Sequence, residues 1–198
     1  MIITAIKQQV KRTDRYSIFV DGVYAFSLSE SGLIQSRLAS GQELTAAELK
    51  RLKKDAGLDK AYHNALHYVA MRARSEWEMG AYLARKDVDA EAAAAIIRRL
   101  TQAGLLDDAD FARSWISNRR ALKSTSKRRL RLELLQKHVP SDVIDLALAG
   151  DEADERQVLL ELIAKKHARY PDRQKFMQYL ARQGFRYDDI KSALDDSA

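Results

Sequence analysis

Apolar residues recur in short runs near the N-terminus and at helical spacing through the rest of the chain. The runs IITAIKQQV, RYSIFV and VYAFSL are rich in β-favouring residues, and the dipeptide Asp21-Gly22 separates the last two. Because Asp-Gly is typical of the two-residue type I′ hairpin turn, this pattern predicts a small three-stranded β-meander. A short helix near residues 29–36 and a helix opening with the capping-box pair Thr45 and Glu48 are expected to cover the meander.

From Leu58 onward the chain is rich in Ala, Leu, Arg, Lys and Glu, which is a helical composition. Apolar periodicity and capping residues divide this part into nine expected helices, so the sequence predicts a mainly α fold. The expected helices are 58–74, 75–86, 90–103, 107–123, 126–138, 141–149, 152–169, 172–183 and 186–195.

Three of these helices open copies of one repeat. Ser75, Ser126 and Asp172 are N-cap residue types, and apolar residues follow each of them 4, 8, 13, 18 and 22 positions later. The first two apolar positions share one face of a helix, the third fills a turn, and the last two share a face of the next helix. These positions are Met79, Leu83, Val88, Ala93 and Ile97; Leu130, Leu134, Val139, Ile144 and Leu148; and Phe176, Leu180, Phe185, Ile190 and Leu194.

One further helix precedes each repeat origin, so the unit of repetition is a three-helix module used three times. A module of about 45 residues buries little apolar surface alone, so the modules are expected to stack into an elongated or curved tandem array. The predicted domains are an N-terminal β-meander with a helical linker, 1–57, and three-helix modules at 58–104, 105–150 and 151–198. A single compact bundle is the alternative.

The residues offer no visible apparatus for catalysis. The chain has no cysteine, glycine-rich phosphate loop or serine elbow, so neither enzyme activity nor a cofactor is expected. His63 and His67 have the spacing of a zinc-binding helix, but Asn64 stands where the metalloprotease motif has glutamate, so no metal site is expected. Acidic groups near Asp107 and Asp151 lie at expected helix starts and are interpreted as caps.

The same features bear on location. The absence of cysteine suits a reducing cytoplasm, and the N-terminus has no apolar run of signal-peptide type. No stretch of about 18 consecutive apolar residues is present, so no membrane contact is expected. Nothing in the sequence requires an oligomer, and a cytoplasmic monomer is the expectation.

Basic residues concentrate in one segment of a chain whose formal net charge is +6. We call the residues Arg119, Arg120, Lys123, Lys127, Arg128, Arg129 and Arg131 the basic run. Cations in the first turn of a helix oppose its dipole by about 0.3–1 kcal/mol each, and Ser126 places three of them there. The sequence therefore predicts that an anion, either phosphate or a carboxylate-rich surface, lies over this helix N-terminus. The alternative is that the long side chains only cover apolar surface.

Three segments resemble the bacterial regulatory protein RecX family, whose members modulate the RecA recombinase. They are ALHYVAMRARSEWEMGAYLARK at 65–86, LTQAGLLDDADFARSWI at 100–116 and YLARQGFRYDDIKSAL at 179–194. They are similar to the family's Arg-x-Arg-Ser-Glu entry, its Gly-hydrophobic-x-Asp-Asp-x-x-Phe-Ala signature and its C-terminal Gly-Phe pattern. The resemblance covers nearly the whole chain, including the N-terminal strands that some members carry.

The resemblance implies tandem three-helix repeats, no catalysis, and the RecA filament on single-stranded DNA as the partner. Similar proteins restrain filament assembly, ATP hydrolysis, strand exchange and co-protease action. The basic run is then the first candidate contact, and Arg72, Arg74 and Arg85 are the second. Two other interpretations remain open at this point: a module that binds bare DNA, with steep salt dependence, and a helical scaffold for an acidic protein.

Overall fold

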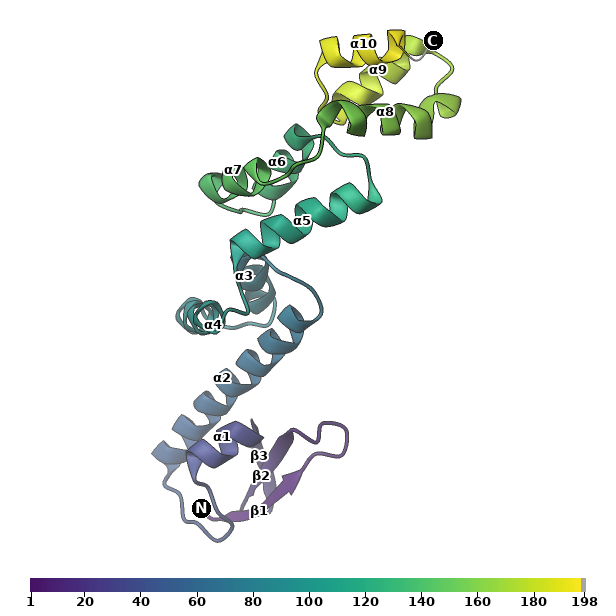
Figure 1. The fold of residues 1–198 in the computed structure, drawn as a ribbon. Coiled ribbons are helices and arrows are strands. Elements are labelled where there is room, and N and C mark those ends of the chain that lie inside the picture. The colour runs from purple at the N-terminus through teal and green to yellow at the C-terminus, as the bar shows by residue number, and fades with distance from the viewer. Residues whose placement is uncertain (197–198) are drawn as a thin grey trace. The chain divides into compact units, whose positions relative to one another are not determined.

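The computed structural model describes residues 1–196 and divides into two compact units. The first unit contains Met1–Arg72 and Met79–Ala103, and the second contains Ala73–Glu78 and the chain from Gly104 onward. Helices account for most of both units, with strands confined to the N-terminal part of the first (Figure 1). The predicted mainly α fold class is therefore confirmed.

The N-terminal strands form the predicted meander. β1 (Ile3–Gln8), β2 (Arg15–Val20) and β3 (Val23–Ser29) pair antiparallel in the order β1-β2-β3. Asp21 and Gly22 join the last two strands with φ angles of 49° and 81°, the pair of positive values that a type I′ turn requires.

One face of this sheet is buried beneath two helices. α1 (Glu30–Ser36) and α2 (Ala46–Ala70) both contact the strands, and the sheet and α1 gather near the N-terminal end of α2 (Figure 1). Ile3, Ile18 and Phe26 are at most 5% exposed in the resulting core. The capping box is present as predicted, since Thr45 Oγ1 accepts from Glu48 N at 3.2 Å and Glu48 Oε2 accepts from Thr45 N at 2.7 Å.

The sequence predicted a break in this helix near Gly57, and that prediction is wrong. α2 is one continuous helix of 25 residues. Its second half is tied to the sheet through Asp59, whose carboxylate accepts from Ser29 N at 2.8 Å and pairs with the buried Arg15 at 3.3 Å. On the other side of Gly57, Ala56 is buried in the core beneath the sheet. Contacts on both sides of Gly57 therefore favour continuity over the modest helix-breaking tendency of one glycine. The proposed domain limits stay predictions.

The other expected helices lie within three residues of their predicted ends. They are α3 (Glu76–Ala84), α4 (Ala90–Gln102), α5 (Asp108–Leu122), α6 (Lys127–Leu135), α7 (Ser141–Ala149), α8 (Glu155–Lys166), α9 (Arg173–Arg182) and α10 (Tyr187–Asp195). The last three residues of the seventh expected helix, 152–169, form instead a 3₁₀ turn, His167–Arg169. In Figure 1 the last three helices are the yellow-green group at the C-terminal end.

The three copies of the repeat share the same N-cap hydrogen bond and the same buried apolar positions. Ser75 Oγ, Ser126 Oγ and Asp172 Oδ1 each accept from the amide three residues later, as the sequence predicted. The apolar positions 4 and 8 residues after each origin are at most 3% exposed in all three copies. Twelve residues after each origin, Asp87, His138 and Gly184 take positive φ angles of 57°, 56° and 94°. Each copy therefore ends its first helix with the same left-handed turn.

In the first copy the last apolar pair is displaced. Ala93 and Ile97 were predicted to form the buried face of α4, but both are half-exposed. Ile96 and Leu100 are buried instead, at 6% and 0% exposure. They are four residues apart and so share a face. Since Leu148 and Leu194 are half-exposed like Ile97, the first copy departs from the other two at Ala93, whose counterparts Ile144 and Ile190 are buried.

Candidate functional site

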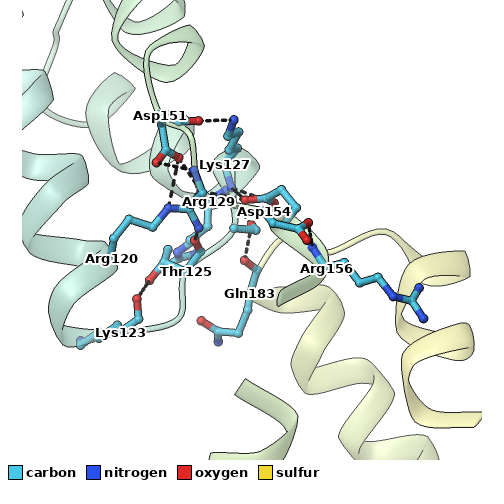
Figure 2. Close-up of polar contacts among 12 residues, drawn as sticks. Arg120, Lys123, Thr125, Lys127, Arg129, Asp151, Asp154, Arg156 and Gln183 are labelled. Carbon is cyan, nitrogen blue, oxygen red and sulfur yellow. Dashed lines mark hydrogen bonds and ion pairs between the residues drawn. The ribbon is translucent and has the colours of Figure 1, made fainter. Parts of the chain in front are cut away.

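The basic run spans the end of α5, a short loop and the start of α6. Arg119 and Arg120 lie in the last turn of α5, where cations complement the helix dipole. Lys127, Arg128 and Arg129 form the first turn of α6 after the Ser126 cap. The structure thus brings the predicted residues of this run together in the second unit, and Figure 2 shows how four of them lie, Arg120, Lys123, Lys127 and Arg129.

Arg120 is the most enclosed cation of the run. Its side chain is 13% exposed and donates to Asp151 Oδ2 at 2.6 Å and to Glu155 Oε1 at 2.8 Å. Burial acts to lower the pKa of Arg120, but the hydrogen bonds and charges of Asp151 and Glu155 outweigh it, and the pKa lies above its ordinary value. The guanidinium also donates to the Thr125 carbonyl (Figure 2). Arg120 therefore ties α5 to the segment that enters α8.

An anion lies over the N-terminus of α6, as the sequence predicted, but the chain itself supplies it. The Glu155 carboxylate accepts from Lys127 N at 3.0 and 3.1 Å. The Lys127 ammonium donates to the Asp151 carbonyl oxygen at 2.7 Å (Figure 2). Glu155 therefore offsets the unfavourable placement of three cations in the first turn of α6.

Glu133 on α6 pairs with other members of the basic run. It accepts from Trp115 Nε1 at 3.0 Å and from Arg119 Nε at 2.8 Å, and Arg129 Nε lies 3.6 Å from its carboxylate. The Arg119 guanidinium also lies over the Trp115 ring at 4.6 Å from its centre. On the other side of α6, Arg131 pairs with Asp145 and donates to Ser141 Oγ at 2.9 Å. These cations hold helices together within the second module.

Two members of the basic run have side chains that are exposed to solvent. Within the part of the chain that the structure describes, Lys123 and Arg128 have no ion pair or side-chain hydrogen bond, and both are exposed. In Figure 2 the Lys123 side chain points away from the cluster. Arg128 lines a cavity of about 440 Å³ together with Arg156 and Arg186, over an apolar floor that includes Phe185.

The second-rank candidates are distributed differently. Arg72 and Arg85 belong to the first unit, whereas Arg74 lies in the short Ala73–Glu78 segment of the second unit. Arg72 and Arg85 are exposed, and Arg74 is half-buried. Sequence reasoning missed Asp151 and Glu155 as partners, because carboxylates near a helix start have an adequate local role as caps. It missed Glu133 because the partners Trp115 and Arg119 lie on another helix, 18 and 14 residues earlier. Asp107 and Asp154 do serve as the predicted N-caps of α5 and α8.

A pair of equivalent contacts, which we call the serine joints, recurs at the repeat period. Ser75 Oγ donates to the Lys137 carbonyl oxygen at 3.1 Å, and Ser126 Oγ donates to the Gln183 carbonyl oxygen at 2.6 Å. Lys137 and Gln183 both stand 11 residues after their own repeat origin. The N-cap serine of one copy is thus hydrogen-bonded to the same position of the next copy.

A carboxylate completes each serine joint. Asp108 Oδ1 accepts from Glu76 N at 2.8 Å, just as Glu155 accepts from Lys127 N. Asp108 and Glu155 are the first residues of α5 and α8, which are equivalent helices of successive modules. Both joints lie within the second unit, because Ser75 and Glu76 belong to it. The repeat therefore specifies how one copy attaches to the next.

Comparison with known families agrees with this repeat. A family model described as the regulatory protein RecX N-terminal domain matches residues 1–45. Models described as the first, second and third three-helix domains of RecX match residues 61–100, 107–148 and 153–194. The chain belongs to the RecX family.

Relatives and solved structures extend this assignment over the whole chain. The regulatory protein RecX of Levilactobacillus brevis is 36% identical over 92% of this chain and 69% of its own length. That of Halalkalibacterium halodurans is 32% identical over 98% of this chain and 77% of its own. A crystal structure of regulatory protein RecX is 30% identical and superposes with a TM-score of 0.74, covering 98% of both chains.

A second RecX structure supports the fold alone. RecX from Lactobacillus salivarius is 24% identical and has a TM-score of 0.61 over 71% of this chain and 96% of its own. The relatives are named regulatory proteins. Among residues 1–196, no helix is long and apolar enough to cross a membrane.

Proposed function

We propose that this chain regulates the RecA recombinase by binding the RecA filament on single-stranded DNA. Binding restrains filament assembly, ATP hydrolysis, strand exchange and co-protease activity. The observation that carries the proposal is family membership along the chain, with one N-terminal and three helical RecX domain models matched in order. The protein acts without catalysis or a cofactor, as a cytoplasmic monomer.

The contacts of the basic run support a division of labour among its members. Arg119, Arg120, Arg129 and Arg131 are paired with carboxylates of the same chain, so they stabilise the second unit. Lys123 and Arg128 are exposed and unpaired within the described residues, so they contact the filament. Of the second-rank candidates, Arg72 and Arg85 are also exposed.

The serine joints support binding to a filament, because they recur at the same position of successive repeats. A filament presents the same acidic and phosphate groups at a regular repeat, and a partner built from equivalent modules meets them with equivalent surfaces. The attachment between the second and third modules, which both lie in the second unit, keeps their surfaces at a constant spacing. Less conformational freedom is then lost on binding, which favours affinity.

The test is RecA ATP hydrolysis on single-stranded DNA, titrated with the full chain. Inhibition at concentrations too low to coat bare DNA supports the proposal. The double substitution K123E/R128E is expected to raise the concentration for half-inhibition about tenfold or more. The matched control R169E/K191E makes the same charge change at exposed cations elsewhere in the second unit and is expected to shift it less than threefold.

Two results would contradict the proposal. An absence of inhibition, together with tight and salt-sensitive binding to bare DNA, would replace RecA regulation by plain DNA binding. Equal effects of the two double variants would show that net charge, and not the basic run, determines inhibition.

A further inference from the structure

α2 carries a row of lysines on one exposed face of the first unit. Lys50, Lys53, Lys54 and Lys60, which we call the lysine face, fall within one side of the helix at 3.6 residues per turn. All four are exposed, and within residues 1–196 none of their side chains has an ion pair or a hydrogen bond. The nearby carboxylate of Asp59 is turned away, bound to Ser29 and Arg15.

This arrangement is unfavourable for the helix by itself. Lys50 repels both Lys53 and Lys54, because like charges three and four residues apart on a helix are neighbours. Gly57 lies on the same face and has no packing reason to be glycine, since a Cβ there would meet no atom within 4 Å. A polyanion lying along the helix would remove the repulsion and could approach the backbone at Gly57.

A groove adjoins the lysine face. Lys54, Gly57 and Lys60 form one wall, and the turn containing Lys86 forms the other, around a volume of about 440 Å³. Three ammonium groups therefore border one groove of the first unit. Asp87 and Asp89 also line it; Asp89 is engaged as the N-cap of α4, accepting from Ala92 N at 2.9 Å.

The residue composition of the lysine face favours nucleic acid over protein as its partner. Cores of protein interfaces are depleted in lysine and enriched in aromatic residues, methionine and arginine. The lysine face presents lysines and Gly57, and the only large apolar residues that line the adjoining groove, Leu58 and Val88, are half-buried, so the face suits phosphates better than a protein surface. Lys50 and Lys60 are separated by about 15 Å along the helix axis, a length over which one strand with the base stacking of a duplex presents about four phosphates at 3.4 Å each.

We propose that the lysine face, together with Lys86, binds the phosphate backbone of single-stranded nucleic acid directly. This contact goes beyond the proposed regulation of RecA, because it needs no RecA subunit. It is a second basic surface, made of other residues than the basic run. The charges of its four helix lysines reach solvent without intramolecular ion pairs or side-chain hydrogen bonds within residues 1–196, while the Lys86 ammonium lies 5.9 Å from the centre of the Tyr82 ring. The backbone, and not the bases, is recognised, so binding is independent of sequence.

The test measures binding of the full chain to a labelled single-stranded oligonucleotide, without RecA, by fluorescence anisotropy across a series of salt concentrations. Each lost phosphate contact lowers the slope of log affinity against log salt by about 0.7 for single strands. The triple variant K50Q/K54Q/K60Q is therefore expected to lose about 2 from the slope and at least tenfold in affinity at low salt. The control K11Q/K166Q/K191Q has the same net charge and is expected to keep the slope.

Several results would overturn this assignment. An unchanged slope in the triple variant excludes phosphate contacts at the lysine face, and equal losses in the control reduce the effect to net charge. A loss seen with duplex DNA but not with the single strand would assign the surface to double helices. A loss of RecA-filament binding with an unchanged slope on bare DNA would assign it to a protein partner. RecA inhibition is measured in a separate assay, so the outcome of this binding test does not decide the regulatory proposal.

Discussion

Ser126 Oγ donates a 2.6 Å hydrogen bond to the carbonyl oxygen of Gln183 while accepting one of 3.1 Å from Arg129 N. One hydroxyl therefore caps α6 and attaches the second module to the third. Its counterpart Ser75 has the same two contacts, to Glu78 N and the Lys137 carbonyl oxygen. The joint is thus encoded by the repeat, and its contribution to stability can be measured residue by residue.

Replacing Ser126 by alanine removes both of its hydrogen bonds. We expect the free energy of unfolding to fall by about 1–2 kcal/mol, since both a cap and the partly buried Gln183 carbonyl lose their partner. Urea denaturation monitored by circular dichroism measures this. Asp172→Ala removes the equivalent cap without a joint and should cost about 1 kcal/mol. A smaller loss for Ser126 than for Asp172 would contradict the role of the joint.

Gly184 is required where the third module meets Ser126. Its φ is +94°, and a Cβ there would come within 2.4 Å of Ser126 Oγ and 3.0 Å of Arg129 N. We expect Gly184→Ala to destabilise the protein by about 2–3 kcal/mol through backbone strain and displacement of the joint. Gly104→Ala has a positive φ but no atom near the added Cβ, so its cost should be about 1 kcal/mol. Thermal unfolding of the two variants tests this order.

Arg120 stabilises the link between α5 and α8. Arg120→Ala leaves the Asp151 side chain, which is 8% exposed, without its cation, so we expect a loss of about 2 kcal/mol in unfolding free energy. Arg113→Ala breaks an exposed pair with Asp110 and should change stability by less than about 0.5 kcal/mol. Equal effects in chemical denaturation would show that the Arg120 cluster is no stronger than a surface ion pair.

Asp108 makes stability depend on pH. Burial raises the pKa of Asp108 despite the lowering effect of its hydrogen bond from Glu76 N. The folded state therefore binds this proton more tightly than the unfolded state. The resulting stabilisation is present below the ordinary aspartate pKa of about 4 and is lost as pH rises through the raised pKa.

Asp108→Asn retains an oxygen to accept from Glu76 N but cannot ionise. We therefore expect the stability of this variant relative to the parent chain to increase as pH rises from about 4 to 7. Denaturation midpoints at several pH values measure the difference. Asp142→Asn, at an exposed helix start, serves as the control. A difference for Asp108→Asn that shrinks as pH rises would contradict the raised pKa.

Gly57 weakens α2 without a packing benefit. Since a Cβ there meets no atom within 4 Å, Gly57→Ala should raise the unfolding free energy by about 1 kcal/mol. Gly32→Ala is the contrasting variant, because its Cβ would lie 2.8 Å from Asp59 Oδ1 and should destabilise the first unit. A destabilising Gly57→Ala would show that the continuous helix needs flexibility at this position.

The sequence by itself determined the elements and the repeat. Local rules specify the Asp21-Gly22 turn, the Thr45 capping box and the N-caps at Ser126 and Asp172, because each depends on residues only a few positions apart. Apolar spacing also identified buried positions such as Leu130. The candidate cations could be named from the sequence as well, because a run of basic residues with no acidic residue among them can be recognised in the linear sequence.

Only the tertiary structure decided which cations remain available and how helices continue. Glu155 lies 28 residues after Lys127, yet it caps the same helix N-terminus, so no local pattern could reveal that the anion is internal. Asp59 holds α2 straight through Gly57 by binding a strand 30 residues earlier. The lysine face became apparent only when the unbroken helix aligned its lysines. Long-range hydrogen bonds and ion pairs depend on how modules pack, and spacing along the chain does not encode that packing.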